Sequence, residues 1–154
     1  KIAKGINYLH SKGIIHGHIT SKNILVTDNM EPLITDYAFF NLKKLANVFL
    51  KYRNKNAYSA PEILKENKDV NLFCTDYAID SYSYGILLWE IYRSTQPFNV
   101  SMSALYKIVV EDDLRPEISK NFHSGFANLI KSCWDKNKEK RPDFNKILNT
   151  LEQI

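Results

Sequence analysis

Apolar residues recur at helical spacing along the chain and predict most of its secondary structure. Ile2, Ile6 and Leu9 have the spacing of one helix face, so a helix is expected to end near Ser11. The stretch 77–93 is apolar on nearly every side, which predicts a buried central helix rather than an amphipathic one at the surface. The first half of the chain therefore supplies one amphipathic helix before the central one.

Three further helices are predicted after the central one. Ser101 is a suitable N-cap for a helix that runs to about Glu111. Apolar residues repeat at i, i+3, i+4 and i+7 in 123–134 and again from Phe144 onward. Pro142 is expected as the first residue of the last helix, where its missing N–H does no harm.

Two short strands, Ile24 to Val26 and Leu33 to Thr35, flank the turn residues Asp28 and Asn29. The predicted fold class is therefore α+β and mostly α, a helical unit with a small antiparallel β-hairpin.

Composition limits the classes of protein that fit. The 154 residues suit one domain, and 44% hydrophobic residues are enough for a core. The net charge of +4 is mild and no nucleic-acid motif accompanies it, so nucleic acid is not an expected partner. Cys74 and Cys133 form no disulfide framework, which favours a cytoplasmic setting, and no apolar run approaches the ~20 residues of a membrane span. The chain would be cytoplasmic or the cytoplasmic portion of a receptor.

Five short motifs follow one another along the chain. They are His16-Gly17-His18-Ile19-Thr20-Ser21-Lys22-Asn23, Asp36-Tyr37-Ala38, Ala60-Pro61-Glu62, Asp80-Ser81-Tyr82-Ser83-Tyr84-Gly85, and Cys133-Trp134 with Arg141-Pro142-Asp143-Phe144. In this order they resemble H-R-D-L-x-x-x-N, D-F-G, A-P-E, D-x-x-S-x-G and C-W…R-P-x-F of protein kinases. The chain thus resembles the large (C-terminal) lobe of the protein-kinase fold.

Within that superfamily, the sequence is similar to the tyrosine-kinase-like and receptor-like groups. Plant receptor-like pseudokinases, the kinase-homology domains of receptor guanylyl cyclases and the pseudokinase domains of Janus kinases remain open alternatives. The resemblance implies that residues 1–154 are a partial kinase domain, from the end of helix E to helix I. The Gly-rich loop, strand lysine and partner glutamate of a small lobe are not found in this sequence.

Four positions depart from the family pattern. His18 replaces the catalytic aspartate, which accepts the proton of the substrate hydroxyl. Gly17 replaces the arginine that grips a phosphorylated activation loop, Ala38 replaces the glycine of D-F-G, and Lys55 replaces a threonine of Ser/Thr kinases. A neutral or cationic imidazole does not replace an anionic base, so we expect no intact catalytic residue.

The resemblance also implies which residues would hold a nucleotide. Asn23 and Asp36 match the metal ligands of the family, and their oxygen atoms suit Mg²⁺. Lys22 matches an arginine of many tyrosine kinases and would meet a γ-phosphate, while Leu25 matches the apolar residue beneath the adenine ring. ATP and Mg²⁺ are expected only with a small lobe. The alternatives are loop hydrogen bonding for Asn23 and Asp36, simple exposure for Lys22 and ordinary core packing for Leu25.

Five residues are expected to serve structure rather than chemistry. Tyr37 offers an aromatic plug near His16. Glu62 and Arg141 resemble a buried ion pair, and Asp80 is expected to accept backbone N–H groups of the catalytic loop.

The predicted function is a catalytically impaired pseudokinase that acts as a signalling or scaffold module. Its partners would be other signalling proteins, such as a kinase or a receptor. Two alternatives remain open: an active or weakly active protein Ser/Thr or Tyr kinase with an altered catalytic loop, and a non-functional truncated fragment.

Overall fold

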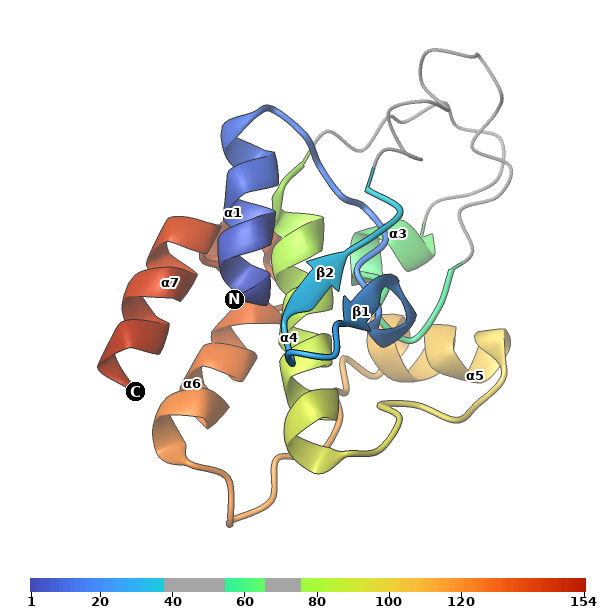
Figure 1. The fold of residues 1–154 in the computed structure, drawn as a ribbon. Helices are drawn as coiled ribbons and strands as arrows, with labels where there is room; N and C mark the ends of the chain where they lie inside the picture. The colour runs from blue at the N-terminus through green and yellow to red at the C-terminus, as the bar shows by residue number, and fades with distance from the viewer. Residues whose placement is uncertain (38–54, 66–75) are drawn as a thin grey trace, which may run out of the picture.

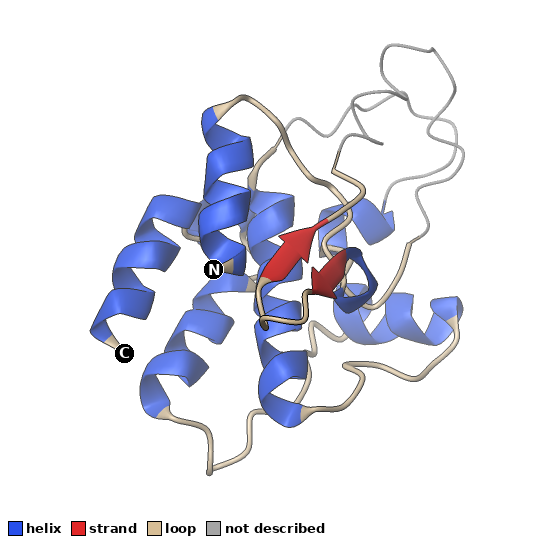
Figure 2. Ribbon diagram, viewed as in Figure 1, coloured by secondary structure: helices blue, strands red, loops and turns tan. Residues whose placement is uncertain are grey.

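The structure is a computed structural model that describes residues 1–37, 55–65 and 76–154. Helices surround a central helix, and a two-stranded antiparallel sheet lies on one side (Figures 1 and 2). The elements, in order, are α1 Ile2–Ser11, η1 Ser21–Asn23, β1 Ile24–Val26, β2 Pro32–Ile34, α3 Pro61–Lys65, α4 Ala78–Arg93, α5 Met102–Tyr106, η2 Lys107–Glu111, α6 Ser124–Cys133, η3 Lys138–Lys140 and α7 Phe144–Gln153. The predicted class, mostly helical with a small antiparallel hairpin, is confirmed.

The central helix α4 separates two parts of the core. Tyr82 and Ile86 pack in a cluster with residues of α3, α5 and η2. Tyr84 and Leu87 pack in a second cluster with residues of α1, α6 and α7. Figure 1 shows the same arrangement, with α1, α6 and α7 to one side of α4 and α3 and α5 to the other. Burial on both sides explains why the sequence of this helix is apolar all round.

The hairpin packs on α1 through one face only. Ile24 pairs with Ile34, and both pack against the second cluster. Gly5 of α1 allows this approach, since a Cβ atom there would lie 2.6 Å from Ile34 Cδ1. The second strand begins one residue earlier than predicted, because Pro32 pairs with Val26 and Thr35 lies beyond the ladder.

Helix caps define the C-terminal helices. Ser101 accepts a hydrogen bond from the Ala104 N–H, as predicted, and the helix then continues as the wider π-turn η2. The prediction for Pro142 was wrong. Asp143 is the N-cap of α7, because its carboxylate accepts the Lys146 N–H, and Pro142 precedes the cap.

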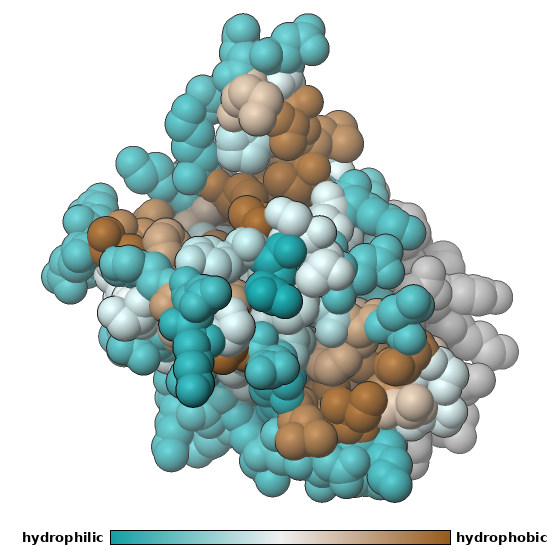
Figure 3. Space-filling model, turned by 90° about the horizontal axis from the view of Figure 1, so that it is seen from below, coloured by the Kyte–Doolittle hydropathy of each residue, from teal (hydrophilic) through white to brown (hydrophobic). Residues whose placement is uncertain are grey.

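Large apolar side chains are also found on the surface. Viewed from below, they gather in separate patches divided by hydrophilic residues (Figure 3). Across the described ranges, no helix is both long enough and apolar enough to cross a bilayer.

Candidate functional site

One buried carboxylate holds the loop that carries His16 and His18. Asp80, at the start of α4, accepts the N–H groups of His16 and Gly17, each at 2.8 Å. The ring Nε2 of His10 lies 2.8 Å from the same carboxylate. Gly17 has a φ of +71°, a conformation that costs a glycine little. The prediction that Asp80 accepts backbone N–H groups of this loop is confirmed.

His16 is fully buried beside this anchor. Its Nδ1 accepts a hydrogen bond from the His18 N–H at 3.3 Å. Burial lowers the pKa of His16, and this outweighs the opposing charge of Asp80. Within the described part of the chain, His16 Nε2 has no hydrogen-bond partner. The Tyr37 side chain is 40% exposed, and its expected role as a plug beside His16 stays a prediction.

The loop places Asn23 against His18. The side-chain Nδ2 of Asn23 donates to the His18 carbonyl at 2.8 Å and lies 3.2 Å from His18 Nδ1. With the amide oriented this way, the His18 ring accepts at Nδ1 and carries its proton on Nε2 when neutral. The amide nitrogen of Asn23 is thus used within the loop, and its Oδ1 is the atom that suits a cation.

Asp36 comes directly after β2 and Thr35. The strand returns the chain toward the loop that carries Asn23. The Thr35 N–H donates to the Asn23 carbonyl at 2.9 Å, directly before Asp36. Asp36 is exposed and has a φ of +63°. Over residues 1–37, 55–65 and 76–154 no group of three or more His, Cys, Asp and Glu side chains could hold a metal. A cation here would therefore depend on one amide and one carboxylate, those of Asn23 and Asp36. Ala38, which replaces the glycine of the family motif, lies outside the described residues.

The outer face of the hairpin is apolar and open. Leu25 and Leu33 are cross-strand neighbours and are 52% and 53% exposed. The interpretation of Leu25 as ordinary core is therefore wrong, and the pair forms a small platform beside the loop. Lys22 is exposed, as both interpretations of that residue require.

The predicted pair of Glu62 and Arg141 is present and bidentate. Arg141 Nη1 and Nη2 donate to the two carboxylate oxygens at 2.6 and 2.9 Å. The Arg141 side chain is 0% exposed and also donates to the carbonyls of Ala78 and Asp135. The Glu62 side chain is 29% exposed, so the pair is fully buried only at the arginine.

A second polar cluster was not predicted from the sequence. Tyr58 donates to Glu90 Oε2 at 2.5 Å, and its hydroxyl lies 3.0 Å from Ser21 Oγ. Ser21 in turn donates to Glu90 Oε1. Burial, with the hydrogen bond to Glu90, raises the pKa of Tyr58 to about 12, so it stays a donor at neutral pH. The cluster ties the loop to α4 through residues far apart in sequence, for which the sequence gives no signal.

Lys55, which replaces a threonine of Ser/Thr kinases, makes a structural contact. Its Nζ donates to the Leu64 carbonyl at 2.7 Å, at the C-terminal end of α3. A cation near the last carbonyls of a helix is stabilising. The substitution therefore supports the segment that contains Ala60-Pro61-Glu62.

The helical lobe, the anchored loop, and the bidentate pair that joins Glu62 to Arg141 define a protein of the kinase class. A family model for protein tyrosine and serine/threonine kinases matches residues 1–151, and the chain belongs to this family.

Curated relatives agree with this assignment. The chain is 33% identical over 154 residues to the serine/threonine/tyrosine-protein kinase HT1 of Arabidopsis thaliana, covering 99% of this chain and 38% of that protein. It is 32% identical to the serine/threonine-protein kinase STY46 of the same plant, covering 99% of this chain and 26% of that protein. It is 34% identical to the RGS domain-containing serine/threonine-protein kinase A of Dictyostelium discoideum, covering 99% and 13%. The chain thus spans well under half the length of these relatives.

Proposed function

We propose that this chain is part of a catalytically impaired protein kinase domain that works as a signalling or scaffold module. The single observation that carries the proposal is His18, at the position of the family's catalytic aspartate. The loop from His16 to Asn23 contains no carboxylate at all. Its partners would be other signalling proteins, a kinase or a receptor, in the cytoplasm.

The position of His18 supports this proposal physically. A catalytic aspartate orients the substrate hydroxyl and takes its proton. His18 Nδ1 already lies within hydrogen-bond distance of Asn23 Nδ2, which leaves Nε2 as a donor in the neutral ring. A donor, or a cation after protonation, does not draw a proton from an attacking hydroxyl.

We also propose that the domain keeps a site for Mg·ATP when a small lobe covers it. Asn23 offers an amide oxygen and Asp36 a carboxylate, which suit a hard cation. The exposed pair of Leu25 and Leu33 offers an apolar floor for an adenine ring. When bound, Mg²⁺ would neutralise phosphate charge; Asn23 and Asp36 would position it, and Lys22 would add a point charge.

The test is a thermal-shift titration with Mg·ATP on the full-length protein. A ligand selective for the native state stabilises it by roughly 2.7 kcal/mol at 100 times its Kd. Asp36→Asn should abolish the shift, because it removes the anionic ligand while asparagine tolerates the left-handed φ. Asp28→Asn, in the exposed turn of the same hairpin, is the matched control and should keep the shift. A shift that survives Asp36→Asn would refute the proposed metal ligand, and no shift at millimolar ATP would refute nucleotide binding.

A further inference from the structure

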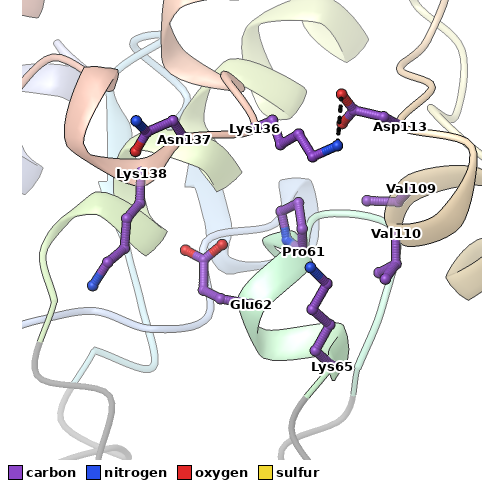
Figure 4. A pocket seen from close by; sticks show the side chains of 9 residues that line it. All are labelled: Pro61, Glu62, Lys65, Val109, Val110, Asp113, Lys136, Asn137 and Lys138. Carbon is purple, nitrogen blue, oxygen red and sulfur yellow. Dashed lines mark ion pairs between the residues drawn. The ribbon is translucent and has the colours of Figure 1, made fainter.

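A pocket formed by described residues lies away from the loop and the hairpin. It has a volume of about 200 Å³ and is lined by residues of α3, η2, and the loops that follow η2 and α6 (Figure 4). Nothing in the proposed nucleotide site uses it. Its walls carry Glu62 and Asp113 together with three lysines, Lys65, Lys136 and Lys138.

The two carboxylates of the pocket are already neutralised. Glu62 is held by both terminal nitrogens of the buried Arg141. Asp113 accepts from Arg115 at 3.2 Å and lies 3.6 Å from the ammonium of Lys136. A cationic ligand would therefore find no carboxylate without a partner among the described residues that line the pocket.

Two of the three lysines, Lys65 and Lys136, are less completely paired than the carboxylates. Lys138 donates to Asp76 at 2.7 Å, and its ammonium points away from the other lining residues in Figure 4. Among the described residues, the one ion pair of Lys136 is the long contact to Asp113, and its side chain is 64% exposed. For Lys65, no ion pair is found within the part of the chain that the structure describes. The Lys65 and Lys136 ammonium groups lie on opposite sides of the pocket (Figure 4).

We propose that this pocket binds one phosphate group, presented as a phosphorylated side chain of a partner protein. Lysine is a common point-charge ligand for phosphate, and two ammonium groups from opposite walls match a dianion. The size fits this ligand. Pockets for whole small molecules are about 300–1,000 Å³, whereas 200 Å³ holds the equivalent of about seven waters at roughly 30 Å³ each.

The experiment is an NMR titration of the full-length protein with O-phospho-L-serine, without magnesium or nucleotide. The backbone amides of Lys65, Val110, Asp113 and Asn137 should shift together and saturate. The affinity should fall as salt is raised from about 50 to 200 mM, because exposed charges are screened. Inorganic phosphate should give the same pattern, since the phosphate group is the recognised chemistry.

Variants separate the pocket from general surface charge. Lys65→Gln with Lys136→Gln should weaken binding about tenfold, the loss expected for two exposed charge contacts. Lys65→Arg with Lys136→Arg should retain it. Lys4→Gln with Lys120→Gln makes the same change of net charge elsewhere on the surface and should leave binding intact. All four lysines are exposed, so none of these variants should impair folding.

Three results would overturn the proposal. They are the absence of any localised shift at tens of millimolar phosphoserine, equal affinity in the two Lys→Gln pairs, or an equal response to acetate. None of these results depends on nucleotide, so this proposal and that of the Mg·ATP site can be refuted independently of each other.

Discussion

The buried anchor residues of this chain match the family pattern, whereas the exposed side chains of its loop depart from it. Asp80 and the pair of Glu62 with Arg141 make the contacts expected of the family. The loop between His16 and Asn23 is still held by Asp80, yet we propose that His18 stands at the position of the family's catalytic carboxylate. The fold and the chemistry are therefore carried by different residues, and one is kept where the other is changed.

Burial explains this difference. Asp80 is fully buried and satisfies two backbone N–H groups, which would be left unpaired if it were lost. His18 is exposed, so a substitution there leaves little behind that needs a partner. Selection for stability alone would preserve the first residue and tolerate change in the second.

The largest effect is expected at the anchor between α3 and η3. Glu62→Ala would leave the buried guanidinium of Arg141 without its counter-charge, and should lower the free energy of unfolding by roughly 3–5 kcal/mol. Urea denaturation measures this difference. Glu31→Ala is the control, because it removes an exposed carboxylate paired with Lys1 and should cost at most about 1 kcal/mol. Similar losses of unfolding free energy in the two variants would mean that the buried ion pair stabilises the fold no more than the exposed one.

A second scaffold position concerns packing rather than charge. Gly85→Ala in α4 would place a Cβ atom 2.7 Å from Cys133 Cβ and 3.3 Å from the Ile130 carbonyl of α6. Neither neighbour can rotate away, so overpacking should cost roughly 1–3 kcal/mol even after the gain in helix propensity. In Gly125→Ala the new Cβ meets the exposed side chain of Ile154, which can move, and stability should change little. Thermal unfolding of the two variants would contradict the packing argument if Gly125→Ala were the more damaging.

Much of this scaffold could be predicted because its determinants are local or carried by motifs. Helical spacing located α1, α4, α6 and α7, and Ser101 gave the correct cap for α5. The family motifs identified the partners of Asp80 and Arg141. The errors at Pro142 and at the second strand are displacements of two residues and one residue at element ends, where the cap or pairing partner decides the boundary.

The features that could not be predicted depend on contacts between distant residues. Tyr58 meets Ser21 and Glu90 across 37 and 32 positions of the sequence, and no periodicity links them. The open placement of Tyr37 depends on how the chain leaves the second strand. The pocket combines residues of α3 and η2 with those of the segments that follow η2 and α6, so its charges converge only in the folded chain.

Between the anchors and the exposed loop lies His16, whose titration should make stability depend on pH. Burial lowers its native pKa below the ordinary value of 6.5, so the unfolded chain binds its proton first. Stability should therefore be unaffected above pH 6.5 and decrease as the pH falls through and below that value. His16→Asn keeps an acceptor for the His18 N–H but does not titrate. The difference in urea midpoints between the two proteins should thus change with pH, and a constant difference would contradict the argument.

The smallest effect on stability is expected at His18, where the comparison between scaffold and loop is most direct. His18→Asp restores the family's carboxylate at an exposed position, so the free energy of unfolding should change by at most about 0.5 kcal/mol. Phosphoryl transfer from Mg·ATP should not appear, because Gly17 and Lys55 also depart from the family pattern. A radiolabelled ATP transfer assay on the full-length protein measures this, with His18→Asn as the uncharged control of similar size. A sharp rise in turnover for His18→Asp alone would contradict the impaired domain proposed here. It would favour a kinase whose metal site and positioning were intact, since these supply most of the stabilisation of the transferring phosphoryl group.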